Sequence, residues 1–275
     1  MIWRTLKSNR SLHLAFIMLA VLGSGARCED KRQAWQLVWQ DEFDGRAGAL
    51  PDSTRWRFDV GEDWGNAQLE YDTARPSNAA LDGAGHLAIT ARKEEYLGRH
   101  YTSARINTQG LFQQAAGRFE ARMQLPVGQG LWPAFWLLGA NYASVGWPAC
   151  GEIDIMEYRG QEPNLIYGSI HGPVYSGGAA INRRFTLPGP GFDAGFHTFA
   201  VEWDFDHITW LVDDTPYGTV TPANIPARGR WVFDHPFFII LNVAVGGNFV
   251  GPPNAATTIP QTMLVDWVRV QRLVP

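Results

Sequence analysis

The chain of 275 residues is 45% hydrophobic and 13% aromatic, and its 23 basic and 27 acidic side chains give a net charge of −4 at pH 7. Nucleic acids and anionic membranes attract positively charged surfaces, so this balance argues against both as partners. A neutral polymer or a small uncharged substrate is compatible with it.

The first 26 residues have the pattern of a secretory signal peptide. Three basic residues precede the apolar stretch Leu12–Leu22, and the small residues 23–26 follow it. The apolar stretch is too short for a membrane span. We therefore expect cleavage after Ala26 and secretion to the extracellular or periplasmic space. The mature chain would keep 20 basic against 27 acidic residues, a net charge of −7.

The two cysteines of the chain are Cys28 and Cys150. Cys28 raises the alternative of a lipid anchor, but Arg27 directly before it fits a lipoprotein cleavage site poorly. In an oxidising compartment the two thiols can pair. Since Cys28 belongs to a short N-terminal tail, we favour two free thiols over a disulfide.

The mature chain, 249 residues long, predicts strands from end to end. Apolar and polar side chains alternate with the period of two that marks a half-buried strand. A turn at residues 204–206 joins two of these runs as a hairpin, and the best candidate for a short helix lies at 221–228. The alternating runs are 86–91, 118–125, 198–203, 208–212 and 264–270. Without repeats or linkers, this pattern predicts a single antiparallel β-sandwich.

Residues 151–158 place three carboxylates in a short apolar run. The isoleucines of this run predict one buried strand face, which leaves Glu152 and Asp154 on the opposite face. Strict alternation would bury Glu157, and an unpaired buried carboxylate costs several kcal/mol. A β-bulge at Ile155 and Met156 would return Glu157 to the face of the other two acids. We therefore predict a bulged strand with three acids on one face.

Two carboxylates that flank a bond, one ionised and one protonated, are what glycoside hydrolysis requires. Glutamates at the two ends of a curved strand can reach the separation of about 5–5.5 Å that is typical of retaining enzymes. Asp154 between them would raise the proton affinity of its neighbours or share a proton with one of them. The alternative is an exposed acidic strand face without chemistry, which the third acid and the implied bulge disfavour.

Eleven tryptophans remain after the signal peptide. Indole faces bury the apolar faces of sugar rings, so tryptophans in loops beside glycine or proline suggest sugar platforms. Trp132, Trp136 and Trp147 fit this description and precede the acidic strand. Tryptophans within alternating strands more often fill the core, and we assign this role to Trp203, Trp210 and Trp267.

The segment Glu152–Glu157 resembles the catalytic signature of glycoside hydrolase family 16, in its bulged, six-residue form. The likeness covers nearly the whole mature chain, from the opening segment 37–45 to the closing segment 265–270. The Gly146-Trp147-Pro148 and His171-Gly172-Pro173 segments look most like laminarinases, the endo-acting β-1,3-glucanases. The resemblance implies one catalytic domain over residues 27–275, folded as an all-β, curved antiparallel β-jelly-roll sandwich (concanavalin A-like) with a sugar-binding cleft on its concave face.

The resemblance also implies roles for the three acids. Glu152 would be the nucleophile, Glu157 the general acid/base, and Asp154 a hydrogen-bonding partner between them. The implied reaction is hydrolysis of internal β-1,3-glucosidic linkages with net retention, and it needs no cofactor. The expected partner is a laminarin-type β-glucan, and we expect a monomer.

Four further positions carry over from the resemblance as sugar contacts. Asn66 and Arg75 match residues that hydrogen-bond sugar hydroxyls, although Arg75 can equally be a solvated surface charge. Arg105 is either a sugar contact or a cross-strand partner of a carboxylate. His171 is placed in the cleft by the resemblance, whereas a lone histidine is more often structural.

A structural calcium ion is common in the family, and three positions here match its site. Glu42 and Asp266 would provide carboxylates, and a backbone carbonyl around Gly85 would provide the third ligand. Two side-chain ligands make a weak site, structural rather than catalytic.

The chain departs from the family pattern at the ends of the cleft. Asn66-Ala67-Gln68 stands where many laminarinases have Asn-Asn-Glu, with an acid displaced to Glu70, and Phe249 follows Asn248 where tryptophan is frequent. Three alternative functions stay open: a mixed-linkage β-1,3-1,4-glucanase, a galactan hydrolase of the same family, and a non-catalytic glucan-binding module. The last would be expected to lack one or more of the signature acids.

Overall fold

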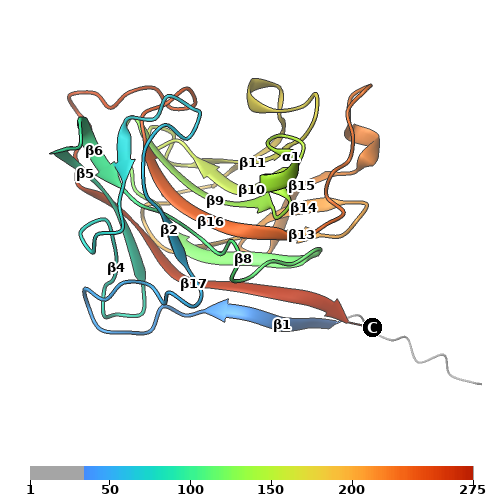
Figure 1. Cartoon of the computed structure of the whole chain (residues 1–275), viewed down its shortest axis with the longest axis horizontal. Coiled ribbons are helices and arrows are strands. Elements are labelled where there is room, and N and C mark those ends of the chain that lie inside the picture. Colours follow the sequence, from blue (N-terminus) through green and yellow to red (C-terminus); the bar gives the residue numbers. More distant parts are fainter. Residues whose placement is uncertain (1–33, 275) are drawn as a thin grey trace, which may run out of the picture. The chain divides into compact units, whose positions relative to one another are not determined.

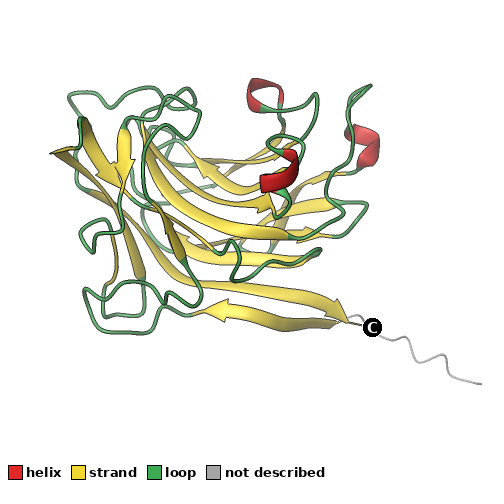
Figure 2. Cartoon of the chain, in the orientation of Figure 1, coloured by secondary structure: helices red, strands yellow, loops and turns green. Residues whose placement is uncertain are grey.

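The computed structural model describes residues 34–274, so the predicted signal peptide and Cys28 lie outside the described residues. Two β-sheets pack face to face, and within residues 34–274 helical structure is confined to three short pieces (Figures 1 and 2). These pieces are α1 (Tyr142–Val145), η1 (Gly177–Ala179) and η2 (Pro222–Asn224). The predicted all-β sandwich is confirmed.

The larger sheet has ten strands in the order β15-β14-β13-β8-β17-β5-β6-β3, with β1 paired to β17 and β4 to β5. Its pairs are antiparallel except for β3 with β6. The strands are β1 (Ala34–Asp41), β3 (Glu70–Asp72), β4 (Ala79–Leu81), β5 (Leu87–Tyr96), β6 (Arg99–Ser103), β8 (Gly117–Gln124), β13 (His197–Trp203), β14 (Ile208–Val212), β15 (Thr215–Val220) and β17 (Gln261–Val274).

The smaller sheet has seven strands in the order β12-β11-β10-β9-β16-β7-β2, all antiparallel. Figure 1 shows its central strands curving over the larger sheet, with loops rising from their ends. The strands are β2 (Arg57–Asp59), β7 (Arg105–Asn107), β9 (Leu131–Gly139), β10 (Glu152–Tyr158), β11 (Leu165–His171), β12 (Ile181–Thr186) and β16 (Phe237–Val245).

The core lies between the two sheets and is built by the predicted alternation. Phe119 on β8 and Val201 on β13 are fully buried, as are Ile153 on β10 and Leu241 on β16. Burial of each such side chain contributes about 1.5–3 kcal/mol. The outer face of the smaller sheet is thereby left free for polar and aromatic side chains.

Two of the three tryptophans predicted for the core lie there, and the third does not. Trp203 and Trp210 are buried. Trp267 is half-buried on the outer face, because a bulge in β17 between Val265 and Trp267 reverses the alternation. The Arg269 guanidinium lies 4.2 Å from the Trp267 ring centroid and covers it instead.

The helix predicted at 221–228 is only the 3₁₀ turn η2, and α1 was not predicted. Cys150 is buried and forms no disulfide within residues 34–274. Over the same residues, the helices are too short for a membrane crossing.

Candidate active site

A bulge interrupts β10 where the sequence predicts one. The register of β10 shifts after Asp154 against both of its neighbours, β9 and β11. The extra residue lies at Ile155 and Met156, both of which are buried. As a result, Glu152, Asp154 and Glu157 all line the cleft on the outer face of the smaller sheet. The predicted bulge is confirmed.

Trp210 on β14 supports this bulge from the larger sheet. Its indole N–H donates a hydrogen bond of 2.7 Å to the backbone carbonyl of Asp154. A Cβ atom at Gly168 on β11 would lie 2.4 Å from Cδ1 of Trp210. Glycine at 168 therefore leaves the space that the indole needs to reach β10.

The cleft crosses the smaller sheet and has a volume of about 980 Å³. Strands on both sides of β10 contribute side chains to it, from β12 at one edge of the sheet to β2 at the other. Six of the seven predicted sugar-binding residues line it: Asn66, Arg105, Trp132, Trp136, Trp147 and His171.

Arg75 is not among the residues that line the cleft. Its guanidinium forms an ion pair of 2.6 Å with Glu94 and lies 4.4 Å from the Tyr96 ring centroid. A further hydrogen bond of 2.9 Å joins it to Asn78. Arg75 therefore belongs to a local network outside the cleft, which is neither the predicted sugar contact nor the solvated surface charge that the sequence left open as the alternative.

Glu157 lies where a carboxyl retains its proton at neutral pH. Burial raises the pKa of Glu157 to about 8, and the neighbouring Asp154 carboxylate adds to the rise. His171 and two hydrogen bonds oppose it: the Trp132 indole N–H donates at 3.1 Å and the Ser169 hydroxyl at 3.4 Å. A protonated carboxylic acid at this end of β10 is equipped to donate to an oxygen in the cleft.

His171 and Trp147 stabilise the anion of Glu152. Burial raises the pKa of Glu152, but His171 counteracts the rise from 3.6 Å away. The Trp147 indole N–H also donates a hydrogen bond of 2.7 Å to Glu152 Oε2. The two glutamates thus have different environments, which separates a proton donor from an ionised carboxylate.

Asp154 and His171 form a buried pair between the glutamates. Nε2 of His171 lies 2.9 Å from Asp154 Oδ2, and the Gly177 backbone nitrogen lies 3.0 Å from Nδ1. Burial opposes protonation of His171, but the charges of Glu152 and Asp154 raise its pKa to about 10, so Nε2–H donates to Asp154. Burial raises the pKa of Asp154 to about 7, Glu152 adds to this rise, and His171 opposes it.

Two of the three tryptophans predicted near β10 hydrogen-bond to its acids. Trp132 and Trp147 each donate an indole N–H to a glutamate, as described above. Trp136 instead donates to the Asn242 side-chain carbonyl at 2.8 Å. Each indole is therefore fixed at its nitrogen, and its apolar ring edge and faces are positioned along the cleft.

Several cleft residues were not predicted as site residues from the sequence. They come from strands whose side chains cannot be assigned to the outer face without the register, and some belong to loops. These residues include Trp64, Tyr167, Ser169, Arg184, Asn242 and Phe249. The Asp-Trp-Gly-Asn run at 63–66 was the available signal for Trp64. Phe249 had been noted only as a departure, and its ring packs 5.1 Å from that of Trp132.

The residues predicted to bind calcium do not fit a cation site. Both carboxylate oxygens of Glu42 accept hydrogen bonds from the Arg269 guanidinium, at 2.8 and 2.9 Å. Asp266 forms an ion pair with Arg122. Calcium needs several oxygen ligands that are free to converge on it, and here each carboxylate already faces a positive charge.

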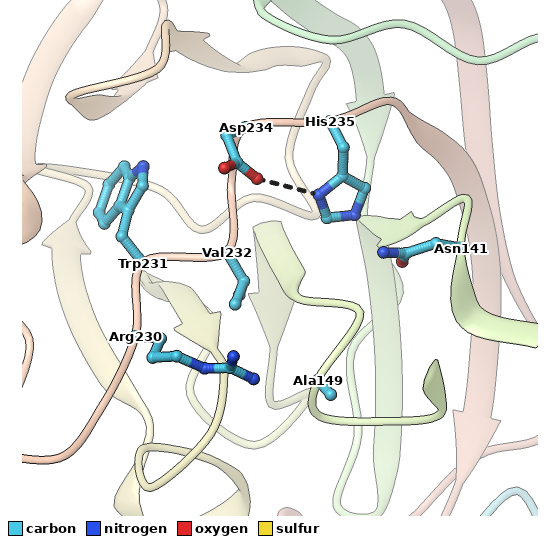
Figure 3. Close-up of a pocket in the computed structure, with 7 residues that line it drawn as sticks. All are labelled: Asn141, Ala149, Arg230, Trp231, Val232, Asp234 and His235. Atoms are coloured by element: carbon cyan, nitrogen blue, oxygen red, sulfur yellow. Dashed lines mark hydrogen bonds and ion pairs between the residues drawn. The ribbon is translucent and has the colours of Figure 1, made fainter. Parts of the chain in front are cut away.

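A second cavity, of about 240 Å³, lies outside the cleft (Figure 3). Its lining comes from the loop before β16 and from the two ends of the β9–β10 connection, and includes Asn141, Ala149, Arg230 and His235. None of the three signature acids lines it.

Comparison with known proteins agrees with this geometry. Residues 65–269 match the model of glycosyl hydrolases family 16. The chain is 41% identical to a beta-glucanase from Rhodothermus marinus over 94% of each chain. The structure of an endo-beta-1,3-glucanase from Pyrococcus furiosus is similar, with a TM-score of 0.82, 46% identity, and coverage of 87% of this chain and 95% of that one. The catalytic domain of a Thermotoga petrophila laminarinase gives a TM-score of 0.84 and 44% identity, over 88% of this chain and 100% of that one.

Proposed function

The chain belongs to glycosyl hydrolases family 16, and from this we propose that it is a retaining endo-β-1,3-glucanase that cleaves internal linkages of laminarin-type glucans. The observation that carries the proposal is the bulged β10, which lines one open cleft with a buried aspartate and two half-buried glutamates of unequal proton affinity. The relatives named as β-1,3-glucanases support the substrate class.

In the first step, Glu157 donates its proton to the glycosidic oxygen while Glu152 attacks the anomeric carbon. The bond to the leaving sugar breaks, and a covalent glycosyl-enzyme forms through Glu152. The pKa of Glu157, raised to about 8 by burial, suits this donor role, and the Trp147 and His171 contacts favour the anion of Glu152.

In the second step, ionised Glu157 takes a proton from water, whose oxygen attacks the anomeric carbon and releases Glu152. Two inversions give net retention. Asp154, hydrogen-bonded through His171 Nε2–H, places a third acid beside Glu152, and a proton can be shared between them. No step requires a cofactor.

The net charge of the mature chain is compatible with an uncharged polymer as substrate, and we propose that the protein is secreted and acts as a monomer. The N-terminal signal pattern carries this proposal for residues 1–26, with cleavage after Ala26. N-terminal sequencing of the secreted protein and its elution volume on size exclusion test both parts.

The decisive experiment measures reducing-sugar release from laminarin, barley mixed-linkage glucan, agarose and κ-carrageenan, with Glu152→Gln as the matched inactive variant. We expect laminarin to be preferred and Glu152→Gln to abolish release. Preference for mixed-linkage glucan or for a galactan would overturn the substrate assignment and keep the mechanism. Glucan binding without release from any polymer would support the binding-module alternative instead.

A further inference from the structure

Trp64 forms a hydrogen bond with a residue that lies outside the cleft. Its indole N–H donates a hydrogen bond of 2.8 Å to Oδ2 of Asp72, at the end of β3. Trp64 lines the cleft, whereas Asp72 does not and is only 2% exposed. The backbone of Asp72 also pairs with Gly61 at the start of the Trp64 loop.

A carboxyl in this position is unfavourable for folding by itself. Its second oxygen, Oδ1, has no hydrogen-bond partner within residues 34–274, and a buried polar atom without a partner costs free energy. Burial raises the pKa of Asp72 to about 7, against the Trp64 hydrogen bond and the charge of Arg105. Among the described residues that line the cleft, Trp64 is the one whose side chain hydrogen-bonds to Asp72.

Trp64 is in turn part of a layered unit with Arg105 and Trp136. The Arg105 guanidinium lies 4.9 Å from the ring centroid of each tryptophan. Asp59 holds Arg105 by an ion pair of 2.9 Å. Arg105 stacks on one face of the Trp64 ring. The hydrogen bond to Asp72 holds the indole at its nitrogen and so fixes the ring in the orientation that this stacking requires.

Within this unit, Arg105 lies away from the bond that is cut, whereas Trp136 on β9 lies opposite Asp154 in the strand register. Arg105 belongs to β7, which is three strands from β10, or about 14 Å at the usual strand spacing. Contacts there bind sugar units remote from the reacting carbon, in the ground state and the transition state alike. Loss of such contacts raises KM and leaves kcat nearly unchanged.

We propose that Asp72 is a positioning residue that acts through Trp64 to form a remote glucosyl-binding wall at the β7–β2 end of the cleft. The inference rests on the proposed glucanase activity and deepens it, because it assigns to this end of the cleft the preference for long substrates. In the sequence, Asp72 is one acid of the run Glu70-Tyr71-Asp72, and nothing in the sequence identifies Trp64 as its partner.

The test is a double-mutant cycle with Asp72→Ala, Trp64→Phe and the pair together, assayed on laminarin and on a short aryl β-laminaribioside. Trp64→Phe keeps a ring but removes the N–H donor. On laminarin, each single change should raise KM by about three- to tenfold, and kcat should change by less than about twofold. The double variant should be no worse than the poorer single variant, because both remove the same interaction.

Two further variants keep the test decisive. Asp72→Asn retains an acceptor oxygen for the indole and should keep KM within about twofold of the parent. Asp41→Ala is the matched control, because Asp41 accepts the indole N–H of Trp56 at 2.8 Å, and neither residue lines the cleft. It should lower the melting temperature and leave KM unchanged. If Asp72→Ala fails to fold, Trp64→Phe and Asp72→Asn decide alone.

Equal losses on the long and the short substrate, additive effects in the cycle, or an unchanged KM in Trp64→Phe would overturn the role of Asp72. Failure of the unaltered protein to cleave either substrate would instead overturn the proposed activity. The two failures are therefore distinguishable.

Discussion

The indole nitrogen of Trp210 lies 2.7 Å from the backbone carbonyl oxygen of Asp154, so a residue of one sheet supports the bulge that carries the acids of the other. Trp210 is fully buried and Gly168 gives it room. The catalytic strand is thus held from the core side as well as by its neighbours β9 and β11.

Trp210→Phe should destabilise the protein and reduce activity together. The change leaves a buried carbonyl without a donor, at a cost of about 1–3 kcal/mol, or a fall in melting temperature of roughly 3–10 °C for a domain of this size. Calorimetry and laminarin kinetics measure the two effects. Trp203→Phe is the control, because Trp203 donates to the Phe233 carbonyl at 3.0 Å, away from the bulge. Full activity in Trp210→Phe would show that the bulge does not depend on this bond.

Glu157→Gln should lower kcat on laminarin by about 10²–10⁴, the usual contribution of a general acid. An aryl glycoside with a good leaving group needs no proton, so its first step should survive the change. Sodium azide should then accelerate turnover and give a β-glycosyl azide, because a small anion attacks the glycosyl-enzyme without a base. Analysis of the product by NMR distinguishes the outcomes; an α-azide would contradict the double displacement.

The pH dependence of kcat/KM should be bell-shaped. Glu157 must be protonated to act as the acid, so activity should be lost as pH rises through about 8. Glu152 must be ionised, and since burial raises its pKa, the acidic limb should lie above the ordinary glutamate value of about 4.3. Rates on a soluble oligosaccharide between pH 4 and 10 provide the profile. If the basic limb of the kcat/KM profile lay below pH 6, it would contradict the assignment of Glu157 as the general acid.

Trp132→Phe should move the basic limb upward. The Trp132 N–H stabilises the ionised form of Glu157, so its removal raises the pKa of that carboxyl further. Trp136→Phe is a matched control, because its indole donates to the Asn242 amide instead of to an acid. The same pH profile in both variants would contradict the link between Trp132 and Glu157.

The sequence by itself determined the sandwich, the bulge and the three acids. Alternation with period two fixes which side chains face the core, and an unpaired Glu157 in that core is so costly that the strand has to bulge. The charge balance likewise favoured a neutral substrate. These conclusions depend on local patterns, which can be identified in a single sequence.

Tertiary structure alone decided which residues meet. The Asp72–Trp64 bond joins residues eight apart through a loop whose path the sequence does not specify. Trp267 was wrongly assigned to the core because a second bulge, in β17, decides which face of the sheet it occupies. The role of Arg75 was left open because its acidic partner, Glu94, cannot be identified from the sequence. Contacts such as Trp210 to Asp154 cross from sheet to sheet, and their existence depends on the packing of strands 56 residues apart, not on any local propensity.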